Sequence, residues 1–219
     1  MLTLYIGNRN ISSWSLRPWL ALKAAGAAFE EKLIVLRATD ATDYRDGLAA
    51  DLLAVNPAGH VPALHDGDLV VWESLAICEY VAELFPDAGL WPADRRARAK
   101  ARALAAEMHA GFADMRREMS MDIGGRHPGK AFSTGAMADA GRAIAIWEEC
   151  LAETGGPFLF GRFGIADAMF APVVTRFRTY GVALPSAASA YAAAVLAYPP
   201  MVEWCKAAEA EVAAERAAS

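Results

Sequence analysis

The first 36 residues have the order strand, helix, strand, and this order constrains the fold more than any other feature of the chain. Leu2–Ile6 is short and β-rich, which predicts a strand. Ser15–Ala25 has helical spacing, with Pro18 in its first turn and Gly26 as a stop signal. Phe29–Leu36 predicts a second strand. Such a unit favours a parallel strand pair joined by a right-handed crossover.

A hairpin and another helix follow this unit. Thr39–Leu53 is polar and predicts a mixed loop and short helix. Val61–His65 and Asp68–Trp72 flank an Asp-Gly turn, which is typical of a β-hairpin. A helix is expected to open at Glu73. The order β-α-β and then β-β-α predicts a thioredoxin-like domain over residues 1–85.

The second half of the chain predicts helices alone. After a linker over residues 86–94, apolar residues recur at helical spacing throughout residues 95–219, and Pro and Gly clusters separate the segments. The expected helices are Arg95–Met119, Ala136–Glu153, Ala166–Tyr180, Ala187–Leu196 and Pro200–Glu215. The predicted fold class is therefore an α/β thioredoxin-like N-terminal domain followed by an all-α C-terminal helical domain.

Composition and charge narrow the function classes. The net charge is -5 and no basic stripe is present, which argues against a nucleic-acid partner. No apolar run reaches about 18 residues, so no membrane span is expected. Cys78, Cys150 and Cys205 fit neither a disulfide framework nor a zinc site, and the four histidines lack metal-ligand spacing. We therefore expect no metal. The cysteine pattern and the absence of a signal-peptide pattern favour the cytoplasm.

The turn before the first predicted helix holds Ser12, Ser13, Trp14 and Ser15. Hydroxyls and backbone N–H groups at the positive end of a helix stabilise an anion such as a thiolate. Because no Cys-x-x-Cys pair occupies the turn, the sulfur is expected to belong to a bound thiol. Serines also cap helices without any ligand, so capping is the alternative interpretation.

Three local patterns together resemble those of the cytosolic glutathione transferase family, in its serine-type zeta and theta classes. They are Ser12–Arg17, Asn56–Leu64 and Glu73–Ile77, and Phe163–Ala168 resembles the start of that family's core helix in the second domain. The second and third patterns are specific in combination, and the four patterns span nearly the whole chain. One departure is Trp14, which stands where the zeta pattern has Cys. The resemblance implies glutathione as co-substrate and a homodimer.

The resemblance also implies roles for single residues. Ser12, with Ser13 in support, would hold the glutathione thiolate, and which hydroxyl contacts the sulfur stays open. The bond between Val61 and Pro62 would be cis, with the Val61 backbone facing the cysteinyl unit. His60 would reach the glycyl carboxylate, or else be an exposed loop histidine.

Further residues complete the expected site. Glu73 suits the γ-glutamyl ammonium and Ser74 its carboxylate, although an acid followed by Ser is also a common helix cap. Arg176 and Arg178 could meet a substrate carboxylate, but a solvated helix face is favoured. The expected walls of the second-substrate pocket are Trp14, Met108, Phe112, Met115 and Arg116, although the Met and Phe spacing also fits plain core.

These expectations amount to a transferase that activates the glutathione thiolate for attack on a small apolar electrophile, as in detoxification. Two alternatives stay open. One is a glutathione-dependent cis-trans isomerase, similar to maleylacetoacetate isomerase, which returns glutathione unchanged. The other is a non-catalytic binding module with the same architecture.

Overall fold

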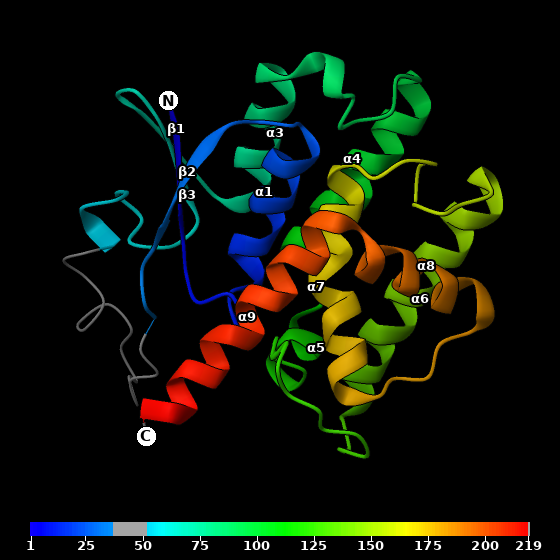
Figure 1. Cartoon of the computed structure of the whole chain (residues 1–219). Coiled ribbons are helices and arrows are strands. Elements are labelled where there is room, and N and C mark those ends of the chain that lie inside the picture. The colour runs from blue at the N-terminus through cyan, green and yellow to red at the C-terminus, as the bar shows by residue number, and fades with distance from the viewer. Residues whose placement is uncertain (37–51, 219) are drawn as a thin grey trace.

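Four short strands form one mixed sheet in the N-terminal half of the chain (Figure 1). β1 (Leu2–Ile6) pairs in parallel with β2 (Phe29–Leu33) and antiparallel with β3 (Ala63–Asp66). β3 pairs antiparallel with β4 (Leu69–Trp72), so the strand order is β2-β1-β3-β4. This arrangement confirms the parallel pair and the hairpin. β2 ends three residues before its predicted end.

The computed structural model describes residues 1–36 and 52–218. The loop and short helix predicted over Thr39–Leu53 lie outside these residues, except for the last two positions. All that follows concerns the described part of the chain.

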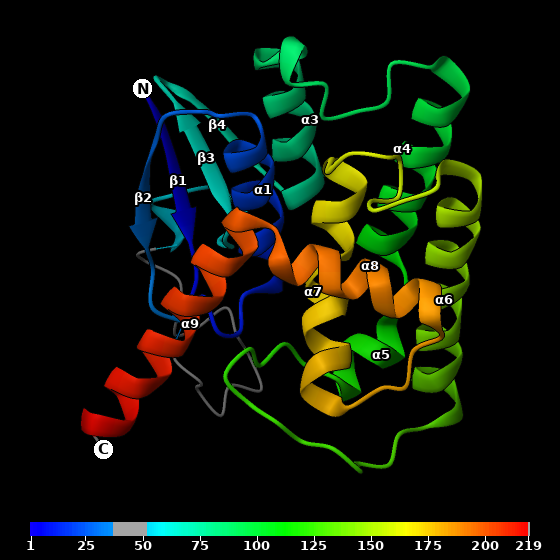
Figure 2. The same cartoon turned by 45° about the vertical axis from the view of Figure 1, so that its right-hand side comes forward.

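Two helices lie on one side of the sheet (Figure 2). α1 (Ser13–Ala24) and α3 (Ser74–Leu84) pack against each other as well as against strands. α1 begins two residues earlier than predicted, because the Ser12 side chain accepts a hydrogen bond from the backbone N–H of Ser15 and caps the helix there.

The second half is helical, as predicted, and follows a short turn of 3₁₀ helix, η1 (Pro86–Ala88). Its helices are α4 (Arg95–Ala110), α5 (Ala113–Glu118), α6 (Thr134–Thr154), α7 (Ile165–Tyr180), α8 (Ser186–Ala197) and α9 (Pro199–Ala218). The fold class is thus confirmed.

One predicted helix is two helices. The segment Arg95–Met119 breaks at Gly111, and Phe112 adopts a left-handed conformation with φ 60°. The new helix start is stabilised from outside, since Asp139 Oδ2 accepts the backbone N–H groups of Asp114 and Met115 at 3.1 Å. The carboxylate that stabilises this break lies on α6, which is separate in sequence. The Ala-rich pattern of Arg95–Met119 does not reveal the break.

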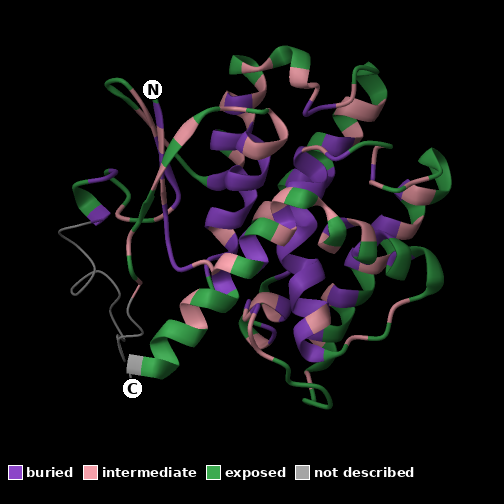
Figure 3. Ribbon diagram, in the orientation of Figure 1, coloured by how far each residue is buried: buried purple, intermediate pink, exposed green. Residues whose placement is uncertain are grey.

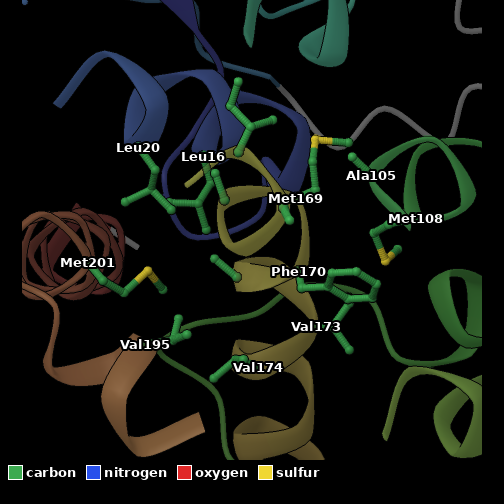
Figure 4. Close-up of a cluster of buried hydrophobic side chains, with 14 of the residues drawn as sticks. Leu16, Leu20, Ala105, Met108, Met169, Phe170, Val173, Val174, Val195 and Met201 are labelled. Atoms are coloured by element: carbon green, nitrogen blue, oxygen red, sulfur yellow. The ribbon is translucent and has the colours of Figure 1, made fainter. Parts of the chain in front are cut away.

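α7 is the centre of the molecule. Every residue of this helix except Arg178 is buried, and Figure 3 shows it as an almost continuous buried rod. α1 packs along it, so Leu16 and Leu20 lie in the same apolar cluster as Met169 and Met201 (Figure 4). The hydrophobic core therefore crosses from the first domain into the second.

The loop before α1 is also held by the helical domain. Asn10 Nδ2 donates to Asp122 Oδ1 at 3.0 Å, and the Gly124 N–H donates to Asn10 Oδ1 at 2.8 Å. Arg9 donates to Glu211 of α9 through both its backbone N–H and its guanidinium. These contacts fix the start of α1 between the two domains.

We expect Asp167→Ala to lower the free energy of unfolding by about 2–4 kcal/mol. Buried Asp167 accepts the backbone N–H groups of Leu159 and Gly164, both at 3.0 Å, and its loss leaves two enclosed donors without partners. Urea unfolding measures the change. Asp94→Ala is the matched control, because Asp94 caps α4 at an exposed position and its loss costs about 1 kcal/mol. Equal losses for both variants would contradict the assignment.

Candidate active site

A pocket of about 310 Å³ opens where the Ser12 turn, the segment before β3 and the start of α3 meet. Its size is at the lower end of the range for small-molecule sites. It is lined by Trp14, His60, Val61, Pro62, Trp72, Glu73 and Ser74. Six of these seven residues were expected in the site from the sequence. Trp72 was assigned only to a strand, although it immediately precedes the Glu73 and Ser74 pair.

Hydrogen bonds among Gly7, Ser12 and Ser15 hold the Ser12 turn together. The Ser12 hydroxyl donates to Ser15 Oγ at 2.8 Å, and Ser15 Oγ also accepts the Gly7 backbone N–H at 3.0 Å. This network ties the end of β1 to the first turn of α1. Within the described residues, the Ser13 side chain makes no hydrogen bond. Ser12 and Ser13 are 6% and 7% exposed, and neither is among the residues that line the pocket.

The segment before β3 is shaped by Asn56. Its Oδ1 accepts the Ala58 N–H at 2.7 Å, and its Nδ2 donates to the His60 carbonyl. The Val61–Pro62 bond is cis, as the resemblance implied. The β1–β3 ladder ends at Ala63, so Val61 lies outside it and lines the pocket. Its backbone groups are therefore not used by the β1–β3 ladder.

The start of α3 carries two features that suit a bound zwitterion. Glu73 has φ 71°, an uncommon conformation for a residue with a side chain. Ser74 is 1% exposed, and its Oγ is enclosed without a hydrogen-bond partner in the described chain. An unpartnered hydroxyl beside the free N–H groups of a helix start can donate to a carboxylate.

His109 of α4 contacts two residues that line the pocket, and the sequence analysis did not identify it. Its Nε2 lies 3.5 Å from Glu73 Oε2, and its ring meets the Trp14 ring edge-on at 5.3 Å. Burial, and then the positive charge of Arg17, lowers the pKa of His109. The lowered pKa favours the neutral imidazole at pH 7, so the contact with Glu73 is not an ion pair between full charges. No local sequence signal marks this contact, because it joins two domains.

Three residues expected around the second substrate lie in the hydrophobic core. Met108, Phe112 and Met115 are buried in the hydrophobic core and are absent from the pocket lining, because their helices turn these faces toward α6 and α7. Trp14 does line the pocket. The Arg116 guanidinium lies 4.9 Å from the centre of the Trp14 ring.

The protein's own sulfur atoms are poorly suited to react. All three cysteines are free and buried. Burial raises the pKa of Cys78 to about 12 and that of Cys150 to about 11, and it raises the pKa of Cys205 as well. Since the thiolate is the reactive form, these thiols are inert at neutral pH.

The described residues lack two kinds of feature. They contain no group of three or more His, Cys, Asp or Glu side chains placed to hold a metal ion. No helix among them is both long enough and apolar enough to span a bilayer.

The mixed four-stranded sheet followed by an all-helical half is the architecture of the glutathione S-transferases. Residues 11–84 match the glutathione S-transferase N-terminal domain, and residues 93–207 match the C-terminal domain of the same family. These matches cover most of the chain, and the protein belongs to the glutathione S-transferase family.

Individual relatives agree with this assignment. A maleylacetoacetate isomerase of Pseudomonas aeruginosa is 30% identical over 186 residues, covering 83% of this chain and 84% of the relative. A probable glutathione S-transferase of Oryza sativa is 47% identical over 72 residues, covering 32% of this chain and 30% of the relative. The solved structure of a glutathione transferase homologue from Burkholderia, with bound glutathione, is 25% identical with a TM-score of 0.70, covering 94% of this chain and 97% of that one. The matches to the first two curated relatives span about a third of those proteins.

Ser15→Ala should lower the free energy of unfolding by about 1–3 kcal/mol. The substitution leaves the buried Gly7 N–H without its acceptor and frees the Ser12 hydroxyl. Chemical unfolding followed by far-UV circular dichroism measures this loss. Ser133→Ala, at the exposed start of α6, serves as the comparison and should cost about 1 kcal/mol. A neutral Ser15→Ala variant would show that the network does not hold the turn.

Proposed function

We propose that this protein is a glutathione transferase that activates the thiol of glutathione for attack on a small electrophile with an apolar body. The main observation in support is the pocket itself, which is lined by Val61, Glu73 and Ser74 together with Trp14 of α1. Glutathione offers a matching set of groups: an ammonium and carboxylate at one end, a peptide backbone, and a thiol. In this proposal His60 meets the glycyl carboxylate.

The γ-glutamyl end would bind at the start of α3. Its ammonium pairs with the Glu73 carboxylate, which neutral His109 leaves uncompensated. Its carboxylate accepts from the Ser74 hydroxyl and from the first N–H groups of α3. The cysteinyl backbone pairs with Val61 at the cis bond to Pro62. These contacts direct the thiol toward the start of α1.

The thiolate would be held by Ser12 and Ser13. A free thiol has a pKa of about 8.5, and lowering it by two units takes roughly 2.7 kcal/mol. One hydroxyl donating to a charged sulfur supplies about 1.5–3 kcal/mol, and the helix N-terminus adds about 0.3–1 kcal/mol. The Ser12 hydroxyl already donates to Ser15, so Ser13 is the more available donor and Ser12 supports its turn.

The reaction then needs little further chemistry from the protein. The sulfur lone pair forms a bond to an electrophilic carbon, and the leaving group departs with the electron pair of the broken bond. The site contributes thiol deprotonation, proximity and exclusion of water. The ring of Trp14 would lie against the apolar body of the substrate. A cytoplasmic homodimer acting in detoxification completes this proposal.

A second candidate reaction is glutathione-dependent cis-trans isomerisation. The extensive match to a maleylacetoacetate isomerase favours it. Here the thiolate adds to a conjugated double bond, the resulting single bond rotates, and elimination returns glutathione. Product analysis separates the two reactions, because glutathione is consumed by conjugation and recovered by isomerisation.

Ser74→Ala should weaken glutathione binding about tenfold without changing stability, since the lost hydroxyl is one of the proposed carboxylate donors. Calorimetric titration with reduced glutathione and with S-methylglutathione measures this affinity. Ser186→Ala, an exposed Ser at the start of α8, is the control and should bind like the unchanged protein. Absence of saturable binding at millimolar ligand would overturn the transferase and isomerase proposals together and favour a non-catalytic module.

We expect Ser13→Ala to raise the pKa of the bound thiol by about one unit or more, because the charged sulfur loses a hydroxyl donor. Ultraviolet absorbance of the thiolate, followed against pH at saturating glutathione, measures this pKa. Ser12→Ala should mainly reduce stability, by about 1 kcal/mol, through the lost helix cap. If both variants leave the pKa unchanged, neither hydroxyl holds the sulfur.

A further inference from the structure

The α5–α6 connection, residues 119–133, reaches from the helical domain to the loop that precedes α1. Figure 2 shows it extending toward the first domain before it returns to α6. Besides the two side-chain hydrogen bonds of Asn10 with Asp122 and Gly124, the Ile123 backbone N–H donates to the Asn10 carbonyl at 3.2 Å. Both ends of the Asn10 amide and its carbonyl are thus bonded to three consecutive residues of this connection.

The same part of the connection is fixed to the end of α7. Thr179 Oγ1 donates to the Asp122 carbonyl at 2.7 Å, and the His127 backbone N–H donates to the Thr179 carbonyl at 2.7 Å. Arg178 Nη2 donates to the Ile123 carbonyl at 3.2 Å. Because α7 is buried along almost its whole length, the backbone around Asp122 has little freedom to move.

The Asp122 carboxylate has a different partner on each oxygen. Oδ1 accepts from Asn10 Nδ2 at 3.0 Å, and Oδ2 accepts from His127 Nε2 at 2.9 Å. The His127 ring packs against the Tyr180 ring, with 5.7 Å between the ring centres. Burial opposes ionisation of Asp122, but the hydrogen bonds from His127 and Asn10 outweigh it and lower the pKa of this carboxyl. At neutral pH Asp122 is therefore an ionised acceptor for the Asn10 amide.

The chain between Asn10 and Ser13 is short and closed by hydrogen bonds. The N–H groups of Ile11 and Ser12 both donate to the Asn8 carbonyl, at 3.2 and 2.8 Å, and the Ser13 N–H donates to the Ile11 carbonyl at 3.0 Å. A turn held in this way has few free dihedral angles. A displacement of Asn10 is therefore passed on to the Ser13 hydroxyl.

A separate contact keeps the loop attached when the Asp122 contact is removed. Arg9 is bonded to Glu211, and its carbonyl accepts from Trp204 Nε1 at 3.0 Å, both on α9. We therefore expect a protein without the Asp122 carboxylate to fold, with the loop held at Arg9 and released at Asn10. Such a variant changes the position of the turn and keeps its sequence.

We propose that Asp122 is a positioning residue for the bound thiol, which acts through Asn10 to set the place of the Ser13 hydroxyl. This inference rests on the proposed function, because it takes the Ser12 turn as the holder of the glutathione sulfur. It gives the helical domain a part in thiol activation. The groups proposed for the rest of glutathione, at Val61, Glu73 and Ser74, belong to other elements, so binding affinity does not depend on Asp122.

The first test separates positioning from binding. With 1-chloro-2,4-dinitrobenzene as electrophile, Asp122→Ala should lower kcat about tenfold and keep the KM for glutathione within about twofold, since a shift of about 1 Å near reacting atoms can cost up to about a hundredfold in rate. The pKa of the bound thiol, measured by thiolate absorbance, should rise by about half a unit or more. Unaltered kcat and thiol pKa in Asp122→Ala would overturn the proposal.

Glu118→Ala is the matched control. The Glu118 carboxylate accepts from the N–H and the hydroxyl of Ser133, at 2.9 and 2.6 Å, at the far end of the same connection. This variant also removes one negative charge from the connection, and it should leave kcat and the thiol pKa unchanged. Equal effects of Glu118→Ala and Asp122→Ala would mean that general loosening or lost charge is responsible, and the proposal would be wrong.

An exchange of the two side chains tests the contact itself. Asn10→Asp alone places a second carboxylate against Asp122 and should lower kcat at least as much as Asp122→Ala does. Adding Asp122→Asn reverses donor and acceptor, because the new amide can donate to the new carboxylate while its oxygen accepts from His127. The double variant should recover kcat to within about threefold of the unchanged protein. A double variant as slow as Asn10→Asp would contradict the proposal.

The last test needs no activity. In the protein without glutathione, amide hydrogen exchange in the peptide covering residues 8–16 should be faster in Asp122→Ala and unchanged in Glu118→Ala. Asn10→Ala removes the same side-chain hydrogen bond from the first domain, and it replaces Asp122→Ala if that variant does not fold. Faster exchange with an unchanged thiol pKa would show that Asp122 holds the loop without positioning the sulfur. Failure of the proposed function is distinguishable, because the unchanged protein itself would then show no saturable glutathione binding.

Discussion

The packing of α1 against α7 is the contact on which the candidate site depends. Leu16 and Leu20 of α1 are fully buried and share one apolar cluster with α7, whereas the opposite flank of α1 meets α3. A buried helix in a close-packed core has little freedom to shift. Because Ser13, Trp14 and Arg17 occupy one turn of that helix, their mutual placement is fixed by helix geometry at a rise of 1.5 Å per residue.

This placement sets groups of opposite charge near Trp14. Glu73 lines the pocket where α3 begins, and burial lowers the pKa of the neighbouring His109, which favours the neutral imidazole. The guanidinium groups of Arg17 and Arg116 lie within cation–π distance of the Trp14 ring, but neither residue lines the pocket. Trp14 therefore contacts both the pocket and these guanidinium groups.

Local sequence patterns predicted the fold, and the resemblance to glutathione transferases predicted most of the residues that line the pocket. Strand periodicity, an Asp-Gly turn and helix start signals sufficed for the first domain. The break at Gly111 escaped prediction because Asp139, on another helix, stabilises the new start. The contact between His109 and Glu73 was not predicted, and Arg176 is buried although a solvated helix face was favoured for it. Both features depend on contacts between segments that lie far apart in the sequence. Met108 and Met115 are buried in the core. Helical spacing alone does not distinguish a core position from a pocket wall.

The replacement of a turn cysteine by Trp14 ties these observations together. A cysteine at that position would put one of the protein's own thiols at the helix start. The indole instead accepts cation–π contact from two guanidinium groups and presents an apolar surface to the pocket. Burial raises the pKa of all three cysteine thiols and keeps them protonated at neutral pH. None of these cysteines is therefore a good nucleophile, which is the physical reason why the proposed reaction takes its sulfur from a bound thiol.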